Sequence, residues 1–220
     1  MIWSDEGYLL SKNNFDENSI IIEIFTLNHG KYTGIVYGGS SRKQKKIFQV
    51  GNKLFLNWKS KAENRHGYFS CELIKPIAPL YFEDKKRSAC LLSSTSFLKI
   101  LLPERQINKK IYSNFESMIE RLDSKNWIKL YIFWELSLIK ELGYEINFLE
   151  TSDNQINQIE INNKSLKIPK MLKKKDLTKI HEDEIKEALS FNKDLLLENF
   201  INPNDLRFPL FRNMLESYYM

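Results

Sequence analysis

The stretch that decides the fold spans residues 31–65 and reads KYTGIVYGGSSRKQKKIFQVGNKLFLNWKSKAENR. Strand-like segments lie on either side of a Gly-Gly-Ser-Ser-Arg turn at residues 38–42. The stretch contains one acid, Glu63, and nine basic residues, which are Lys31, Arg42, Lys43, Lys45, Lys46, Lys53, Lys59, Lys61 and Arg65. Aromatic residues lie among them, namely Tyr32, Tyr37, Phe48, Phe55 and Trp58. Tyr32, Tyr37 and Phe48 could stack on bases or lie in the core, whereas Phe55 and Trp58 are expected in the core. Cations can meet phosphates and flat rings can stack on bases, so the pattern predicts a surface for a polyanion. An ordinary basic β-barrel with aromatic side chains in its core fits the pattern equally well.

The positive charge of the chain is concentrated in this stretch. The whole chain carries a net charge of +5 and the stretch carries +8, so the remainder sums to about −3 (5 minus 8). A general bias of the sequence towards lysine would not gather the charge in this way. A net charge of +5 and a pI near 9.0 suit nucleic acid or anionic lipid as a partner.

Five strands are predicted in the first 75 residues, over residues 2–10, 19–26, 31–37, 53–59 and 67–73. In the fourth of these, Leu54, Leu56 and Trp58 alternate with Phe55 and Asn57, which is the period of a strand with two different faces. Five short strands joined by loops favour a closed barrel, because closure removes the edge strands. An OB-fold is the natural expectation for a basic, aromatic-rich surface, and an SH3-like barrel fits the strand count nearly as well.

After Pro76 and Pro79 the pattern changes to a helical period. Helices are predicted over residues 83–102, 108–122, 127–142, 182–191, 194–201 and 206–219. Asn204 or Asp205 is expected to cap the last of them. The sequence therefore predicts an α+β fold, with a five-stranded OB-fold β-barrel for nucleic acid over residues 1–78 and an α-helical domain over residues 79–220.

Two segments of the predicted helical domain are less regular. Residues 151–163 are rich in Asn, Gln and Ser and predict either a β-turn loop or a mobile excursion. Lys170, Lys173, Lys174 and Lys175 form a basic cluster after Pro169. This cluster is either a second phosphate contact or a solvated lead-in to a helix, and the sequence favours the lead-in.

No catalytic constellation stands out. The chain has neither a P-loop lysine nor a Gly-x-Ser-x-Gly or His-Glu-x-x-His motif. Its two cysteines, Cys71 and Cys90, form no Cys-x-x-Cys pair, so a structural zinc site is not expected. Cys71 with His66 is the one nucleophile–base pair to consider, but Cys71 lies in an apolar strand and is expected in the core. The acidic run after His181 is better explained as the first turn of a helix, where carboxylates favour the positive end of the helix dipole.

We therefore expect binding without catalysis, and neither a metal nor another cofactor. No run of about 18 apolar residues is present, so no membrane span is expected. Residues 1–7 have neither a basic region nor an apolar core of a secretory signal, which makes the cytoplasm the simplest location.

Several short motifs resemble the RecO family of bacterial recombination mediators. In the first half they are Trp3-x-Asp5-Glu6-Gly7, Thr26-x-x-x-Gly30-Lys31, Gly38-Gly39-Ser40-Ser41, and Gly51-Asn52 leading to Trp58. In the second half they are Leu102-Pro103-Glu104-Arg105 and Phe133-Trp134-Glu135-Leu136-x-Leu138-x-x-Glu141-Leu142-Gly143. Their order and spacing resemble the family over residues 3–143, and residues beyond 143 match little.

The resemblance implies an OB-fold followed by an α-helical domain, and a role in the RecF pathway that is not enzymatic. Such proteins bind single- and double-stranded DNA, anneal complementary strands and engage the tail of single-stranded DNA-binding protein. With RecR they help to load the RecA recombinase. By motif position, Lys31 and the basic loop at residues 42–46 would contact DNA. The full set of predicted contacts is Lys31, Arg42, Lys43, Lys45, Lys46, Lys59, Lys61 and Arg65.

One departure from the family is clear. Many relatives carry a four-cysteine zinc module after the Glu-Leu-Gly turn, whereas residues 144–169 contain no cysteine. We therefore expect an excursion without zinc near residues 147–170.

Two other functions remain open: a protein-interaction adaptor whose basic face is incidental, and a fragment of a nuclease or ligase, since OB-folds are often appended to such enzymes.

Overall fold

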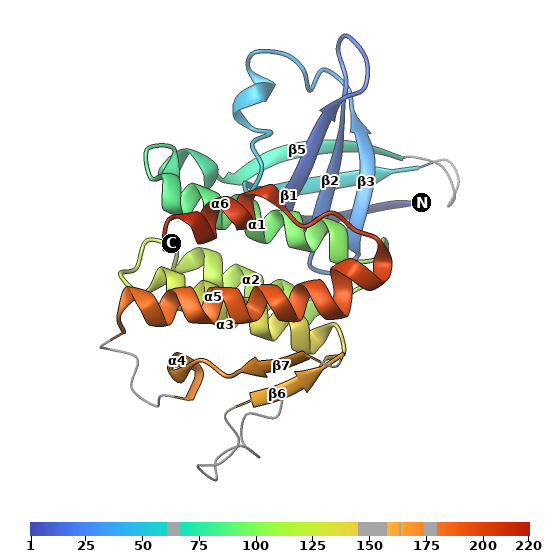
Figure 1. Ribbon diagram of the computed structural model, residues 1–220. Coiled ribbons are helices and arrows are strands. Elements are labelled where there is room, and N and C mark those ends of the chain that lie inside the picture. The colour runs from blue at the N-terminus through green and yellow to red at the C-terminus, as the bar shows by residue number, and fades with distance from the viewer. Residues whose placement is uncertain (61–66, 145–157, 163, 174–179) are drawn as a thin grey trace. The chain divides into compact units, whose positions relative to one another are not determined.

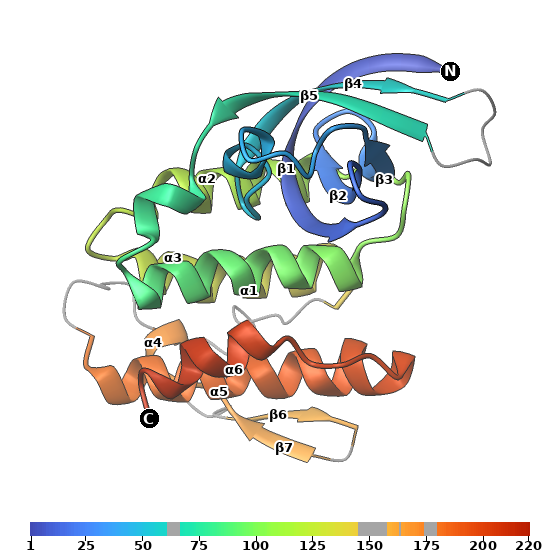
Figure 2. The ribbon, with the colours of Figure 1, turned by 90° about the horizontal axis from the view of Figure 1, so that it is seen from above.

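The computed structural model describes residues 1–60, 67–144, 158–162, 164–173 and 180–220. The chain divides into two compact units, Met1–Tyr112 and Ser113–Met220. Strands come first along the chain and helices follow, which confirms the predicted α+β class (Figures 1 and 2). The predicted domain boundary after residue 78 stays a prediction.

The first unit is built on five strands, which are β1 (Ile2–Asn14), β2 (Ile20–Thr26), β3 (Gly30–Val36), β4 (Lys53–Lys59) and β5 (Gly67–Lys75). They form a closed barrel in the order β1-β2-β3-β5-β4, because β1 pairs with both β2 and β4. Every pair is antiparallel except β3 with β5, which is parallel. The order agrees with the five-stranded Greek-key barrel of the OB-fold.

The predicted alternation along β4 is confirmed. Leu54, Leu56 and Trp58 are at most 2% exposed and belong to the barrel core, whereas Asn57 and Lys59 are exposed. Successive side chains of a strand point to opposite faces, so burying one set turns the other towards solvent. This alternation places Lys59 on the outside of the barrel.

The seam between β3 and β5 is short and is built around an indole ring. The two strands pair only through Gly34 with Gly67 and Ile35 with Tyr68. A Cβ atom added at Gly34 would lie 2.4 Å from the ring of Trp58, and one added at Gly67 would lie 2.2 Å from it. Glycine is therefore required at both positions, because only a backbone without a side chain can approach the Trp58 ring so closely.

Helix α1 (Lys85–Leu101) completes the first unit and packs against β1. The side chain of Asp84 caps it by accepting a hydrogen bond from the backbone N–H of Arg87 at 2.9 Å. Helix α2 (Lys109–Glu120) begins in this unit, and the ring of Tyr112 packs on those of Tyr8 and Phe25. Both helices lie within the ranges predicted for them.

The second unit consists mainly of helices. They are α3 (Trp127–Glu141), the short α4 (Lys170–Lys173), α5 (Glu182–Leu196), which continues as the π-helical turn η3 (Leu197–Ile201), and α6 (Leu210–Ser217). Helices α3 and α5 pack side by side (Figure 1). Strands β6 (Gln158–Ile161) and β7 (Lys164–Lys167) form an antiparallel hairpin.

Three predictions about this unit need correction or remain incomplete. Residues 182–191 and 194–201 form one continuous helical segment, because Asn192 is buried and its side chain donates to the carbonyl oxygen of Ile132. The prediction that Asn204 or Asp205 caps the last helix is wrong, because α6 begins only after Pro209. Part of the predicted loop at 151–163 forms β6 instead and Asn162 follows it in a turn, whereas residues 151–157 and 163, like Lys174 and Lys175, lie outside the described residues.

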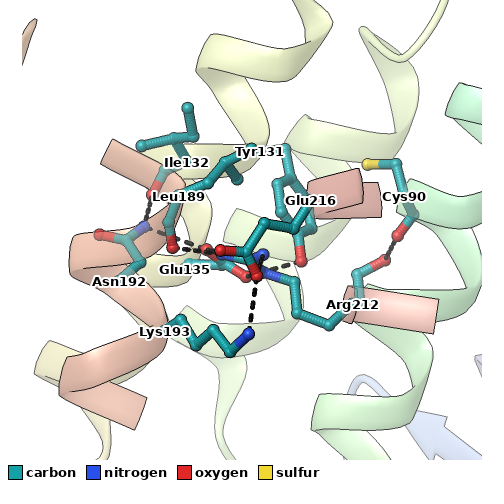
Figure 3. Close-up of polar contacts among 10 residues, drawn as sticks. Cys90, Tyr131, Ile132, Glu135, Leu189, Asn192, Lys193, Arg212 and Glu216 are labelled. Atoms are coloured by element: carbon teal, nitrogen blue, oxygen red, sulfur yellow. Dashed lines mark hydrogen bonds and ion pairs between the residues drawn. The ribbon is translucent and has the colours of Figure 1, made fainter. Parts of the chain in front are cut away.

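A buried polar cluster, which we call the Arg212 network, joins α3, α5 and α6 (Figure 3). Its members are Tyr131, Glu135, Asn192, Lys193, Arg212 and Glu216. Arg212 and Glu135 have fully buried side chains, and their Nε and Oε1 atoms are 2.6 Å apart. Burial opposes the charge of Arg212, but the nearby Glu135 carboxylate outweighs it, so the pKa of Arg212 is raised above its usual value.

None of the described helices has both the length and the apolar character needed to cross a membrane.

Candidate nucleic-acid interface

A short helix in the loop between β3 and β4 carries the most concentrated positive charge. This helix, η1 (Gln44–Lys46), has helical backbone geometry that extends to Lys43 and Ile47. Ile47 packs against the barrel core, and Phe48, the next residue, is part of that core with 1% of its surface exposed. The two apolar residues therefore anchor the loop and fix which way η1 faces.

The buried Asn52 holds the end of this loop. Its Nδ2 donates to the carbonyl oxygen of Ile47 at 3.0 Å, and its Oδ1 accepts the backbone N–H groups of Ile77 and Ala78 at 2.9 and 3.0 Å. Asn52 is fully buried, so these three hydrogen bonds form away from competing water. The Gly51-Asn52 pair singled out in the sequence thus positions η1.

The residues around η1, which we call the basic segment (residues 42–46), turn their cations outward. In a 3₁₀-helix side chains three positions apart lie on the same side, so Gln44 shares the anchored side with Ile47. The four basic side chains, Arg42, Lys43, Lys45 and Lys46, are all exposed. The basic segment therefore presents four cations to solvent on a short helix that Ile47 and Phe48 attach to the barrel core.

Lys12 of β1 extends this charge. Burial lowers the pKa of Lys12, and the positive charge of Lys45 lowers it further. The second effect is the repulsion between the two ammonium groups. An anion bound beside Lys12 and Lys45 would relieve this repulsion.

A hollow of about 510 Å³ lies beside the basic segment, over the seam between β3 and β5, and we call it the seam hollow. Its residues are Ile2, Val36, Tyr37, Gln44, Phe48, Asn57, Trp58, Lys59, Tyr68, Phe69, Ser70 and Cys71. The apolar side chains among them include the buried Phe48, Trp58 and Phe69, and Gln44 connects the seam hollow to η1. Lys59 contributes a cation from β4.

Two tyrosines stand exposed at this hollow. Tyr37 is 65% exposed and Tyr68 is 39% exposed. Their rings stack with centroids 4.9 Å apart and an angle of 21° between the planes. A hydrogen bond to Tyr68 raises the pKa of the Tyr37 hydroxyl. The tyrosine pair, Tyr37 and Tyr68, is therefore a preformed aromatic surface in contact with water.

The structure brings together most of the predicted DNA contacts that it describes. Arg42, Lys43, Lys45 and Lys46 form the basic segment, and Lys59 lies at the adjoining seam hollow. Lys61 and Arg65 lie outside the described residues.

Lys31 has a different setting. It is 8% exposed, and its Nζ donates to the carbonyl oxygen of Lys99 in α1 at 2.6 Å. Burial lowers the pKa of Lys31, although the carboxylates of Glu23 and Glu104 oppose this shift. Lys31 is the second residue of β3 and Tyr37 directly follows that strand, so the two residues are roughly 20 Å apart at about 3.3 Å per residue. Lys31 therefore lies apart from the basic segment and helps to join the barrel to α1.

The aromatic residues also separate into two groups. Stacking on bases and a place in the core were both open for Phe48, and the structure places it in the barrel core. Trp58 is in the core as predicted, whereas the same prediction for Phe55 is wrong, because Phe55 lies half-buried on the other face of β4. Tyr32 is half-buried and meets the rings of Trp3 and Trp58 edge-on, at 5.0 and 5.3 Å.

Tyr68 was missed in the sequence, although a signal for it was present. In the strand that begins at Gly67, alternation places Tyr68 on the face opposite the buried Phe69. The register then pairs Tyr68 with the exposed Lys59. An aromatic residue on the outer face of a strand, opposite a lysine, is typical of a surface that stacks bases.

The residues that the sequence offered as a nucleophile or as metal ligands have structural roles, as far as the structure describes them. Burial raises the pKa of the Cys71 thiol to about 12, so this cysteine is not a nucleophile near neutral pH, and His66 lies outside the described residues. His181 and the acids after it form the start of α5, as predicted. Across the described ranges, no three His, Cys, Asp or Glu side chains gather as a metal site would require.

Comparison with known protein families agrees with the barrel and the helices that follow it. The family model "Recombination protein O N terminal" matches residues 1–77, and "Recombination protein O C terminal" matches residues 83–203. The chain belongs to the RecO family. RecO proteins also appear among its curated relatives. "DNA repair protein RecO" of Roseobacter denitrificans is 35% identical over 147 residues, which are 66% of this chain and 61% of the relative.

Two further relatives are similar to the chain in the same way. "DNA repair protein RecO" of Cereibacter sphaeroides (strain ATCC 17029 / ATH 2.4.9) is 35% identical over 147 residues, 67% of this chain and 61% of the relative. The protein of that name from Jannaschia sp. (strain CCS1) is 31% identical over 158 residues, 72% of this chain and 65% of the relative. The matched part of the chain thus covers less than two thirds of the length of these relatives.

The zinc module carried by many members of the RecO family does not fit this chain. Four thiolates would be needed, and the chain contains only Cys71 and Cys90. Cys71 lies in β5 and Cys90 in α1, both as free thiols. The second unit of this RecO family member therefore contains no cysteine from which such a module could be built.

Proposed function

We propose that this chain is a DNA repair and recombination mediator that binds single- and double-stranded DNA, anneals complementary strands and helps to load a recombinase. Its membership of the RecO family supports the role in DNA repair and recombination. The observation that carries the DNA-binding part is the exposed basic segment on an OB-type barrel, beside an aromatic hollow.

The proposed mechanism is neutralisation of charge with little reading of sequence. Arg42, Lys43, Lys45, Lys46 and Lys59 contact phosphates and release the counterions that the DNA had condensed. Contacts to phosphates hold a strand without occupying its base edges. Two strands held on one basic surface repel each other less and keep their base edges free, so complementary strands can pair.

Lys61 and Arg65 remain proposed contacts, because they lie only two and six residues after Lys59 along the chain. Lys31 is left out of the proposed interface. Its ammonium group is committed to the carbonyl oxygen of Lys99, and moving it to a phosphate would leave that buried contact broken.

The test is a triple charge reversal of the basic segment, Lys43→Glu with Lys45→Glu and Lys46→Glu. Each substitution changes the charge by −2, so the net charge falls from +5 to −1. We expect strand annealing to be lost and binding of single-stranded DNA to weaken by more than about a hundredfold at low salt. Annealing is followed with complementary fluorescent oligonucleotides.

The matched control reverses three lysines of the second unit, Lys125, Lys167 and Lys186, all of which are exposed. It has the same net charge as the first variant. If annealing depends only on net charge, both variants lose it equally, and the proposed interface is wrong. If only the variant of the basic segment loses annealing, annealing depends on where the cations lie and not on net charge alone.

We further propose, from the family resemblance, that the chain acts with RecR and with the tail of single-stranded DNA-binding protein. The alternative function is a protein-interaction adaptor whose basic face is incidental. One observation favours that alternative: the exposed Leu80 and Phe82 in the first unit, where Phe82 lines a largely apolar hollow of about 350 Å³. Retained binding of both partner proteins without measurable DNA affinity at low salt would select the adaptor.

A further inference from the structure

The exposure of the tyrosine pair is not explained by packing. A ring buried in the core removes apolar surface from water, but Tyr37 keeps 65% of its surface exposed and Tyr68 keeps 39%. The two rings nevertheless hold a fixed arrangement, stacked at 4.9 Å. The stacking also brings Tyr37, which follows β3, against Tyr68 of β5. The fold thus leaves an ordered aromatic surface open to solvent.

The surroundings of the pair combine two kinds of contact. The seam hollow beneath it offers apolar rings, including the buried Trp58 and Phe69, and polar groups from Asn57 and Ser70. Its volume of about 510 Å³ falls within the range of roughly 300–1,000 Å³ that is usual for sites that hold small molecules. A flat, partly polar ring system such as a nucleobase has the shape and polarity for such a site.

The cations lie where the backbone of a bound strand would run. Lys59 pairs directly with Tyr68 across the β4–β5 ladder, which puts their Cβ atoms about 5 Å apart. Gln44 lines the same hollow and lies between Lys43 and Lys45 in the basic segment. Positive charge on two sides of an aromatic surface complements a base that is attached to phosphates, and does not complement a purely apolar segment.

A duplex cannot use this surface in the same way. In double-stranded DNA each base is covered by its neighbours in the stack and is paired at its edge, so no ring face is available. Proteins that bind single strands place aromatic side chains against bases that are unstacked. We infer that Tyr37 and Tyr68 form a stacking platform for an unpaired base, so that this surface prefers single-stranded to double-stranded DNA. This inference rests on the proposed DNA-binding function and adds strand preference to it.

The test removes the ring of Tyr37 and compares two DNA forms of equal length. Tyr37→Ala and Tyr37→Leu remove the stacking ring, the second while keeping apolar bulk, and Tyr37→Phe keeps the ring. Affinity is measured by fluorescence anisotropy at one low salt concentration, with a 20-nucleotide single strand and a 20-base-pair duplex. Circular dichroism establishes that each variant is folded, and Phe82→Ala, which removes another exposed ring of the first unit, is the control.

Because one stacked base contributes about 1–3 kcal/mol, we expect the Ala and Leu variants to bind the single strand roughly five- to a hundredfold more weakly. Their duplex affinity should change less than about twofold, and Tyr37→Phe and Phe82→Ala should bind like the wild type. An equal loss for both DNA forms, or no loss for either, overturns the platform while the basic segment remains a DNA-binding surface. A wild-type protein that binds neither form contradicts the proposed function itself.

Discussion

The basic segment and the Arg212 network use the same kind of side chain in opposite ways. In the basic segment, Arg42, Lys43, Lys45 and Lys46 are exposed on a short helix that apolar residues hold in place. In the second unit, Arg212 is fully buried and pairs with Glu135 at 2.6 Å. The charge is available to a ligand in the first case and is neutralised within the protein in the second.

The comparison shows that the surroundings of a cation, and not its presence in the sequence, determine its role. A buried charge is costly unless an opposite charge and hydrogen bonds compensate it. Arg212 meets this requirement through Glu135 and through the carbonyl oxygen of Leu189, which its Nη2 reaches at 2.7 Å. An exposed lysine needs no such compensation within the protein, so its ammonium group is available to bind phosphates.

The largest expected effect is a loss of stability when the buried ion pair of the Arg212 network is broken. Arg212→Ala leaves Glu135 as a buried carboxylate without its guanidinium partner, although Tyr131 and Asn192 still donate to it. The free energy of unfolding should fall by about 3–5 kcal/mol. Urea unfolding followed by circular dichroism measures this change.

The control for that prediction removes both charges together. Arg212→Met combined with Glu135→Leu should recover most of the lost stability, because no unpaired charge remains in the core. A single Arg212→Ala variant that loses less than about 1 kcal/mol would show that the Arg212 network is not important for stability.

A second prediction concerns Asp5, whose side chain is almost fully buried in β1. Burial acts to raise the pKa of Asp5, but hydrogen bonds from His29, Asn28 and the backbone N–H of Glu6 outweigh it, so the pKa lies below its usual value of 3.8. The folded state therefore favours the carboxylate. Its stabilising effect should be complete above about pH 4 and should fade as the pH falls through the lowered pKa.

Asp5→Asn tests this pH dependence. We expect a loss of about 1–2 kcal/mol of unfolding free energy at pH 7, from weaker hydrogen bonds, and a smaller difference from the wild type near pH 3. Glu72→Gln, at an exposed position of β5, is the control and should change stability little at either pH. A loss for Asp5→Asn that is the same at both pH values would contradict the lowered pKa.

The third prediction sharpens the comparison within the first unit. Lys31→Met removes the hydrogen bond to the carbonyl oxygen of Lys99 but keeps most of the apolar stem of the side chain. Stability should fall by about 1 kcal/mol, and the affinity for single-stranded DNA should stay within about twofold of the wild type. If the DNA affinity falls strongly while stability is unchanged, Lys31 belongs with the basic segment.

The smallest expected effect concerns Lys59, the cation beside Tyr68. Lys59→Met should weaken single-stranded DNA binding about three- to fivefold near 0.1 M salt, which is what the loss of one phosphate contact predicts. Lys75→Met is the control, because Lys75 is exposed and pairs with Lys53 at the opposite end of the same β4–β5 ladder. Equal effects of the two substitutions would mean that DNA does not distinguish the two ends of the ladder.

The sequence allowed the barrel and the basic segment to be predicted because both depend on local patterns. Alternation in residues 53–59 indicated which face is buried, and the run of cations at 42–46 indicated an exposed loop. The same alternation, applied to the strand at Gly67, would also have identified Tyr68.

The rest depends on contacts between residues that are distant in the sequence. Nothing in the sequence around Lys31 distinguishes it from a lysine that binds phosphate. Its structural role comes from the hydrogen bond to the carbonyl oxygen of Lys99, 68 residues away. Arg212 and Glu135 are 77 residues apart, and no local periodicity predicts that they meet in the core. Phe48 follows four cations closely, yet it fills the barrel because the loop turns inward after Ile47.

The most direct test of the central claim, that the exposed cations of the basic segment bind the phosphates of DNA, is the salt dependence of single-stranded DNA binding. The five exposed cations Arg42, Lys43, Lys45, Lys46 and Lys59, with or without Lys61 and Arg65, predict a slope of log affinity against log salt of about −3.5 to −5. Neutralising Lys43, Lys45 and Lys46 to Met should bring this slope about two closer to zero. A wild-type slope near zero, or a slope that the triple substitution leaves unchanged, would contradict the claim.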